Sequence, residues 1–145
     1  MFRDIAPGDR AVFISMMEKL YSSKAVSHKV DRSVFEAAFD AAIKKSPYLR
    51  AFIIEDGGKP AGYALVSFSY AVETGGLAVL LEDLYLDDTC RGKGYGGGFL
   101  RFIEKEYPDA RRFRLEVTAE NVRAIELYRR QGYEILDYVQ MVKDR

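Results

Sequence analysis

The run from Arg91 to Gly98, which reads RGKGYGGG, has the composition of an anion-binding loop. Glycines lack a Cβ atom, so their backbone N–H groups can approach a ligand closely. The run lies between a predicted strand and a predicted helix, and the N-terminus of a helix carries a partial positive charge. This combination is typical of a phosphate-binding loop, and we expect the backbone amides of the run to hold phosphate groups.

A dinucleotide site is an alternative interpretation of the same glycines. Gly92, Gly94 and Gly97 satisfy the G-x-G-x-x-G pattern, and Glu116 ends the next predicted strand at about the expected distance. Against it, Asp87–Arg91 separates the preceding strand from the first glycine, and the chain is short for two mononucleotide-binding halves. A P-loop is excluded, because no Gly-Lys-Ser/Thr follows.

Few residues outside the loop are available for acid–base chemistry. The one histidine, His28, lies in a polar stretch typical of a solvated loop, so no metal site is expected. The one cysteine, Cys90, has only Arg91 as an activating neighbour; we interpret it as an ordinary thiol, and an acyl-cysteine intermediate stays open as an alternative. Glu82 and Asp83 are flanked by apolar residues, and burying a carboxylate is costly without a partner or a role. Catalysis is therefore expected to depend on carboxylates, tyrosines or the backbone.

Amphipathic helices and strands must position these residues. Ser33 and Glu36 predict a capping box at the start of the second helix. Apolar spacing predicts helical stripes over 13–21 and 35–43, a hairpin of Ala51–Glu55 and Ala61–Val72, a strand Leu77–Leu86, a helix Tyr95–Tyr107, a strand Arg112–Val117, a helix Asn121–Gln131, and short strands Tyr133–Leu136 and Tyr138–Lys143.

The strand Leu77–Leu86 indicates the fold class. It is apolar on both faces except at Glu82 and Asp83, and such a strand is usually covered on both sides. We therefore expect a single α/β (α+β) domain over residues 1–145, with a mixed, mainly antiparallel twisted sheet and helices on both faces. Within it, Leu77–Leu86 and Arg112–Val117 should run parallel as part of a central β-α-β unit.

Composition narrows the class of protein. The 145 residues carry 22 basic and 22 acidic side chains, without the basic surplus of a nucleic-acid-binding protein. No segment has the continuous apolar run of a signal peptide or a membrane span. A lone cysteine is typical of a reducing compartment, so a cytoplasmic protein is expected. Composition leaves a homodimer open.

Two motifs in order carry a family resemblance. Arg91, Gly94 and Gly96 fit the pattern Arg/Gln-x-x-Gly-x-Gly/Ala, and NVRAIELYRRQGY downstream fits Asn-x-x-Ala-x-x-x-Tyr-x-x-x-Gly-Phe/Tyr from Asn121 onward. Together they resemble the GNAT superfamily of N-acetyltransferases. The resemblance implies a GNAT-like fold and acetyl-CoA as co-substrate. Tyr95 departs from the pattern, because the family usually has an aliphatic residue there.

The resemblance also implies roles for individual residues. The backbone of the strand before the loop would pair with the pantetheine arm, loop amides would hold the pyrophosphate, and an asparagine would bond to the arm. These cofactor-binding residues would be Leu84, Leu86, Arg91, Gly92, Lys93, Gly94, Tyr95, Gly96, Gly97 and Asn121. Tyr128 would lie by the thioester sulfur as the catalytic acid.

The strand segment LLEDLYL is similar to the polyamine and diamine acetyltransferase branch, which carries an acidic pair there. Glu82, Asp83, Asp87 and Asp88 form an acidic cluster that suits a cationic acceptor. We expect Glu82 to be the base through a water, Asp83 to be the reserve, and acetyl transfer to a small-molecule amine or a peptide N-terminus in a ternary complex. A non-catalytic acyl-CoA-binding module and a dinucleotide-dependent oxidoreductase are the alternatives.

Overall fold

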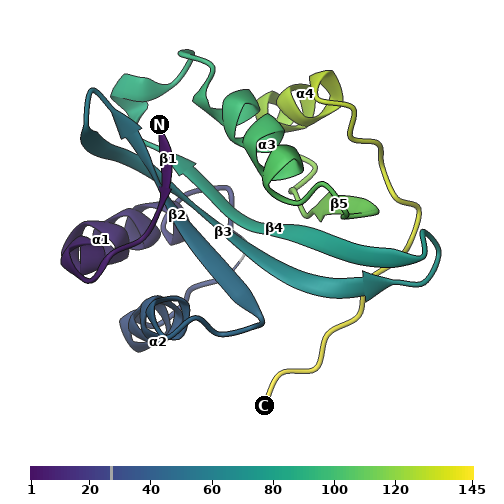
Figure 1. The fold of residues 1–145 in the computed structure, drawn as a ribbon, viewed down its shortest axis with the longest axis horizontal. Coiled ribbons are helices and arrows are strands. Elements are labelled where there is room, and N and C mark those ends of the chain that lie inside the picture. Colours follow the sequence, from purple (N-terminus) through teal and green to yellow (C-terminus); the bar gives the residue numbers. More distant parts are fainter. Residues whose placement is uncertain (27) are drawn as a thin grey trace.

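Five strands form one sheet in the order β1-β2-β3-β4-β5, as the ribbon in Figure 1 shows. The structure, a computed structural model, describes residues 1–26 and 28–145. The elements are β1 (Phe2–Asp4), the 3₁₀ turn η1 (Pro7–Asp9), α1 (Arg10–Tyr21), α2 (Arg32–Ile43), β2 (Leu49–Asp56), β3 (Lys59–Ala71), β4 (Gly76–Leu86), the 3₁₀ turn η2 (Asp88–Cys90), α3 (Tyr95–Glu106), β5 (Arg112–Leu115) and α4 (Val122–Arg130).

The sheet is mixed, as the sequence predicts. Strands β1 to β4 pair antiparallel in chain order, and the turn after Asp56 closes the β2–β3 hairpin. Strand β5 pairs parallel with β4, which confirms the predicted β-α-β unit around α3. This pairing is short, because only Ala78–Leu81 of β4 face Arg112–Leu115 of β5. Past Leu81 the two strands part.

Helices cover both faces of the sheet. Figure 1 shows α1 and α2 on one face and α3 with α4 on the other. Strand residues alternate between two cores, since successive side chains point to opposite faces. Ile53, Tyr63 and Leu65 pack under α1 and α2, whereas Phe52, Ala64 and Val66 pack under α3. Helices on both faces of the sheet explain why β4 is apolar on both of its faces except at Glu82 and Asp83.

A β-bulge interrupts β4 at Glu82. Leu65 faces Asp83 across the β3–β4 ladder, but its neighbour Val66 faces Leu81, so Glu82 is the extra residue. Without the bulge, Glu82 and Asp83 would point to opposite faces of the sheet. The bulge breaks that alternation, and both side chains line one cavity on the α1–α2 face.

Two expectations about secondary structure are wrong. Ser33 does not open a capping box, because its hydroxyl donates to the Asp31 carboxylate (2.8 Å) and Asp31 is the N-cap of α2. Residues 133–145 contain no strand, although their apolar alternation predicted two. A strand needs a partner for its backbone N–H and C=O groups, and local pattern cannot supply one. The apolar side chains of this segment therefore remain exposed, as at Val139 and Met141.

In the described ranges, 1–26 and 28–145, no helix is long and apolar enough to cross a membrane. Ser27, in the polar connection from Ser22 to Asp31, lies outside the described residues.

Candidate active site

The loop between η2 and α3 has the backbone geometry of an anion site. Gly92 and Gly94 have φ of 79° and 84°, a left-handed conformation that strongly favours glycine. Gly94 is the N-cap of α3, so the first amides of the helix have no intrahelical acceptor. Within the described part of the chain, no hydrogen bond involves the N–H groups of residues 92–97. These free donors, at the positive end of α3, can bind phosphate oxygens.

The remaining glycines of the run have a packing reason. A Cβ on Gly96 would lie 3.0 Å from Cδ2 of Leu127 in α4 and 3.9 Å from Cδ2 of Leu84 in β4. On Gly97 it would lie 3.0 Å from Nε2 of Gln131. Because glycine has no Cβ at these two positions, α3 can lie close against α4. This close packing also explains why glycine continues into the first helical turn, where no side chain then covers the amides.

Asp56 ties the loop to the β2–β3 turn. Its carboxylate accepts hydrogen bonds from Lys93 Nζ (2.8 Å), Tyr95 Oη (2.8 Å) and Cys90 Sγ (3.4 Å). The hydrogen bond from Lys93, followed by those from Tyr95 and Cys90, lowers the pKa of Asp56 to about 2. Tyr95 therefore departs from the aliphatic pattern for a reason: it holds the loop in place. Sequence reasoning missed Asp56.

Past Leu81, the edge of β4 that faces β5 is open. Leu84 and Leu86 still pair with Ala64 and Gly62 of β3, but in the described residues no strand pairs with them on the other side. The open edge runs toward the glycine loop, so the backbone groups of β4 on this side are available to an extended ligand. Thr118, on the segment after β5, has a buried hydroxyl with no hydrogen-bond partner among the described residues.

The two motif residues of α4 differ in surroundings. Asn121 is the N-cap of the helix, and its Oδ1 accepts a hydrogen bond from the N–H of Ala124 (3.3 Å). Tyr128 packs against the core under α3, 6.0 Å from the ring of Tyr133. Burial raises the pKa of Tyr128. Among the described residues no hydrogen-bond partner contributes to this shift.

On the other face of the sheet, Asp83 is a buried carboxylate with two partners. Tyr21 Oη donates to its Oδ1 (2.8 Å) and Tyr63 Oη donates to its Oδ2 (2.9 Å). Only 6% of the residue is exposed. Burial raises the pKa of Asp83, and the two tyrosine hydrogen bonds offset this only in part. Burial beside this carboxylate also raises the pKa of both Tyr21 and Tyr63.

Glu82 is not buried, contrary to the expectation from its apolar flanks. The bulge turns its side chain to the rim of the cavity, where Ser67 Oγ donates to Oε1 (2.7 Å). The expected acidic cluster is also divided. Asp87 accepts from Tyr85 Oη (2.9 Å) and Asp88 pairs with Arg91 (3.2 Å), and neither carboxylate lines the cavity. Among the described residues no group of acidic, histidine or cysteine side chains is placed to hold a metal ion.

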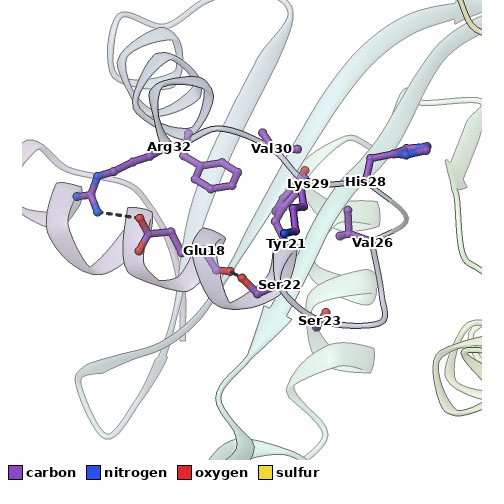
Figure 2. Close-up of a pocket in the computed structure, with 10 residues that line it drawn as sticks. Glu18, Tyr21, Ser22, Ser23, Val26, His28, Lys29, Val30 and Arg32 are labelled. Carbon is purple, nitrogen blue, oxygen red and sulfur yellow. Dashed lines mark hydrogen bonds and ion pairs between the residues drawn. The ribbon is translucent and has the colours of Figure 1, made fainter.

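The cavity beside the acidic pair has a volume of about 370 Å³ and a mostly apolar lining. It is lined by Met17, Tyr21, Val30, Val34, Phe35, Ala38, Tyr48, Leu49, Leu65, Ser67, Glu82 and Asp83. A second hollow of about 480 Å³ adjoins it through Tyr21, Val30 and Phe35. Figure 2 shows this second hollow between the end of α1, the 22–31 connection and the start of α2.

The arrangement places the candidate acid and bases on opposite faces of the sheet. Tyr128 lies on the α3 face, whereas Glu82 and Asp83 lie on the α1–α2 face. A carboxylate and a phenol are the groups that proton removal and proton donation require.

Residues 14–133 match the acetyltransferase (GNAT) family. No curated protein matches the chain.

Solved structures share the fold. An integron cassette protein from the mobile metagenome of Cole Harbour Salt Marsh is 23% identical, with a TM-score of 0.80 over 99% of this chain and 89% of that one. A possible acetyltransferase from Clostridium difficile is 15% identical, with a TM-score of 0.83 over 100% and 97%. The aminoglycoside N-acetyltransferase AAC(6')-Iy, solved in complex with CoA, is 15% identical, with a TM-score of 0.81 over 100% and 94%.

Proposed function

Because the chain belongs to the acetyltransferase (GNAT) family and is an N-acetyltransferase, we propose that it acetylates a primary amine that enters from the α1–α2 face. The observation that carries the proposal is the β4 bulge, which brings Glu82 and Asp83 to one cavity at the point where β4 and β5 part. The cavity volume of about 370 Å³ suits a small molecule or the end of a peptide.

Acetyl-CoA would bind from the α3 side of the sheet, where β4 and β5 part. The free amides of residues 92–97 and the N-terminus of α3 would hold its pyrophosphate, and the open edge of β4 at Leu84 and Leu86 would pair with its pantetheine arm. Asn121 is a further candidate partner for the arm, although its Oδ1 already caps α4. Acetyl-CoA supplies the acetyl thioester when bound.

The acceptor must lose a proton before its nitrogen can attack, since an alkylammonium has a pKa of ~10. Sequence reasoning favoured Glu82 as base and kept Asp83 in reserve. The surroundings now favour Asp83, because burial raises its pKa above that of an ordinary aspartate. Exposed Glu82 would attract the ammonium group to the rim. The proton would pass to Asp83 directly or through one water.

Tyr128 is the proposed acid. Its hydroxyl has no hydrogen-bond partner among the described residues and it lies on the face opposite the carboxylates, so it would donate a proton to the leaving sulfur. Amine attack without a covalent enzyme intermediate requires both substrates to be bound together. Cys90 offers a poor alternative nucleophile, since it is buried with its thiol toward Asp56.

The test is thiol release from acetyl-CoA in the presence of a panel of amines, amino acids, aminoglycosides and short peptides. We expect release that depends on the acceptor, with intersecting lines in double-reciprocal plots. Tight acetyl-CoA binding without thiol release in the presence of any of these acceptors would indicate a non-catalytic acyl-CoA-binding module instead. Binding of NAD but not CoA would indicate a dinucleotide enzyme, for which the mainly antiparallel sheet is the wrong scaffold.

A further inference from the structure

We infer that the preferred acceptor is a monoamine with an apolar body, an alkylamine or arylalkylamine, and that the extended polycation suggested by the acidic motif is a poor substrate. The inference rests on the proposed function and names its substrate class. Its basis is how charge is distributed around the cavity on the α1–α2 face.

The negative charge of the cavity is confined to one end. Glu82 and Asp83 are the only charged side chains among the described residues that line it. The cavity can therefore neutralise one ammonium group, at the end where acetyl transfer would occur. A second ammonium group further along the acceptor would meet no carboxylate.

The opposite wall is built from apolar side chains of α2 and β2. Val34, Phe35 and Ala38 supply the α2 side, and Leu49 with the ring of Tyr48 supplies the β2 side. Val34 is 53% exposed and Tyr48 is 75% exposed. Large apolar side chains left open to solvent at the rim of a cavity are typical of a surface that an apolar ligand covers.

The adjoining hollow would also repel a polycation. It is lined by Lys29 and Arg32, and its one carboxylate among the described residues, Glu18, already pairs with Arg32 at 2.7 Å. Figure 2 shows this pair on one side of the hollow, and Tyr21 also lines the cavity beside the acidic pair. An amine long enough to pass Tyr21 would bring its second positive charge toward Lys29 and Arg32, where no unpaired carboxylate lines the described part of the hollow, and this costs free energy.

n-Pentylamine and 1,5-diaminopentane are a matched pair for the test, because they have the same chain length and differ by one terminal ammonium group. We expect kcat/KM for pentylamine to exceed that for the diamine by tenfold or more. In the series from propylamine to hexylamine, kcat/KM should rise about threefold to fourfold per methylene until the alkyl chain covers the apolar wall of α2 and β2.

A substitution on the wall should reverse the preference. Val34→Glu places a carboxylate at an exposed position in the first turn of α2, where helices accept acidic residues well. We expect it to raise kcat/KM for the diamine relative to pentylamine by about tenfold, whereas the uncharged Val34→Gln should not. Val72→Glu makes the same change on an exposed residue outside both hollows and is the matched control.

The outcomes separate the inference from the function beneath it. Equal rates for the pair, or a faster diamine in the unmodified enzyme, would overturn the inference while leaving the proposed acetyl transfer intact. A preference that changes equally in Val34→Glu and Val72→Glu would also overturn it, since the charge would then act from a distance. Absence of thiol release with every amine would overturn the proposed function and the inference together.

Discussion

Replacing Tyr63 by phenylalanine tests whether Asp83 is the base. The change removes one hydroxyl that donates to Asp83 Oδ2 at 2.9 Å, in a place where both residues are buried and water cannot replace it. Above the pKa of Asp83 the lost bond is to a charged acceptor, which corresponds to about 1.5–3 kcal/mol of unfolding free energy. Below that pKa the acceptor is neutral and the loss falls to about 0.5–1.5 kcal/mol.

The sign of the pH dependence follows from the raised pKa of Asp83. The folded state holds this proton more tightly than the unfolded state, so the contribution of Asp83 to stability is lost as pH rises through its folded pKa. Tyr63 lowers that pKa through its hydrogen bond. Without it the pKa rises further, because the hydrogen bond stabilises the charged carboxylate more than the neutral acid.

Two assays measure the consequence. Denaturant unfolding at a series of pH values should show the destabilisation by Tyr63→Phe growing as pH rises through the folded pKa of Asp83. If Asp83 takes the amine proton, the acid limb of kcat/KM should also move to higher pH in the variant. Ionisation of the amine itself is common to both enzymes and cancels in the comparison.

Tyr85→Phe is the control. It removes a hydroxyl that donates to Asp87, a carboxylate outside the cavity that solvent reaches, so neither assay should change with pH in the same way. An acid limb that stays in place in Tyr63→Phe, together with a pH-independent loss of stability, would refute the assignment. Loss of the limb in Glu82→Gln would then identify Glu82 as the base.

Four further outcomes are expected. Gly94→Val forces a β-branched residue to φ near 84°, so calorimetric affinity for acetyl-CoA should fall at least about tenfold, and the rise in melting temperature that saturating ligand gives the wild type should vanish; unchanged affinity in a folded variant would contradict the loop assignment. Tyr95→Phe removes the hydrogen bond to Asp56 and should raise KM for acetyl-CoA about twofold to tenfold with kcat kept; an unchanged KM would show that the loop holds its position without this bond. Tyr128→Phe should lower kcat at least about 100-fold while leaving the melting temperature unchanged, because no hydrogen bond with the described residues is lost; a near-normal kcat would remove the proposed acid. Cys90→Ala should retain activity with intersecting initial-velocity lines, whereas parallel lines abolished by the variant would reveal an acyl-cysteine.

Local sequence chemistry determined much of this protein. Glycines at positions that need positive φ predicted the loop, and apolar spacing predicted α1, α3 and the β2–β3 hairpin. The two-sided apolar character of β4 predicted helices on both faces of the sheet. Each of these features depends on neighbours within a few residues, which is the range over which a single sequence is informative.

Other features depend on contacts between residues far apart in the chain. Whether Glu82 or Asp83 is buried was decided by a bulge in the β3–β4 ladder, because one extra residue reverses which face each following side chain takes. Asp56 became part of the site only because the β2–β3 turn meets the glycine loop. Residues 133–145 have the apolar alternation of strands and remain irregular, since a strand forms only where another strand satisfies its backbone hydrogen bonds.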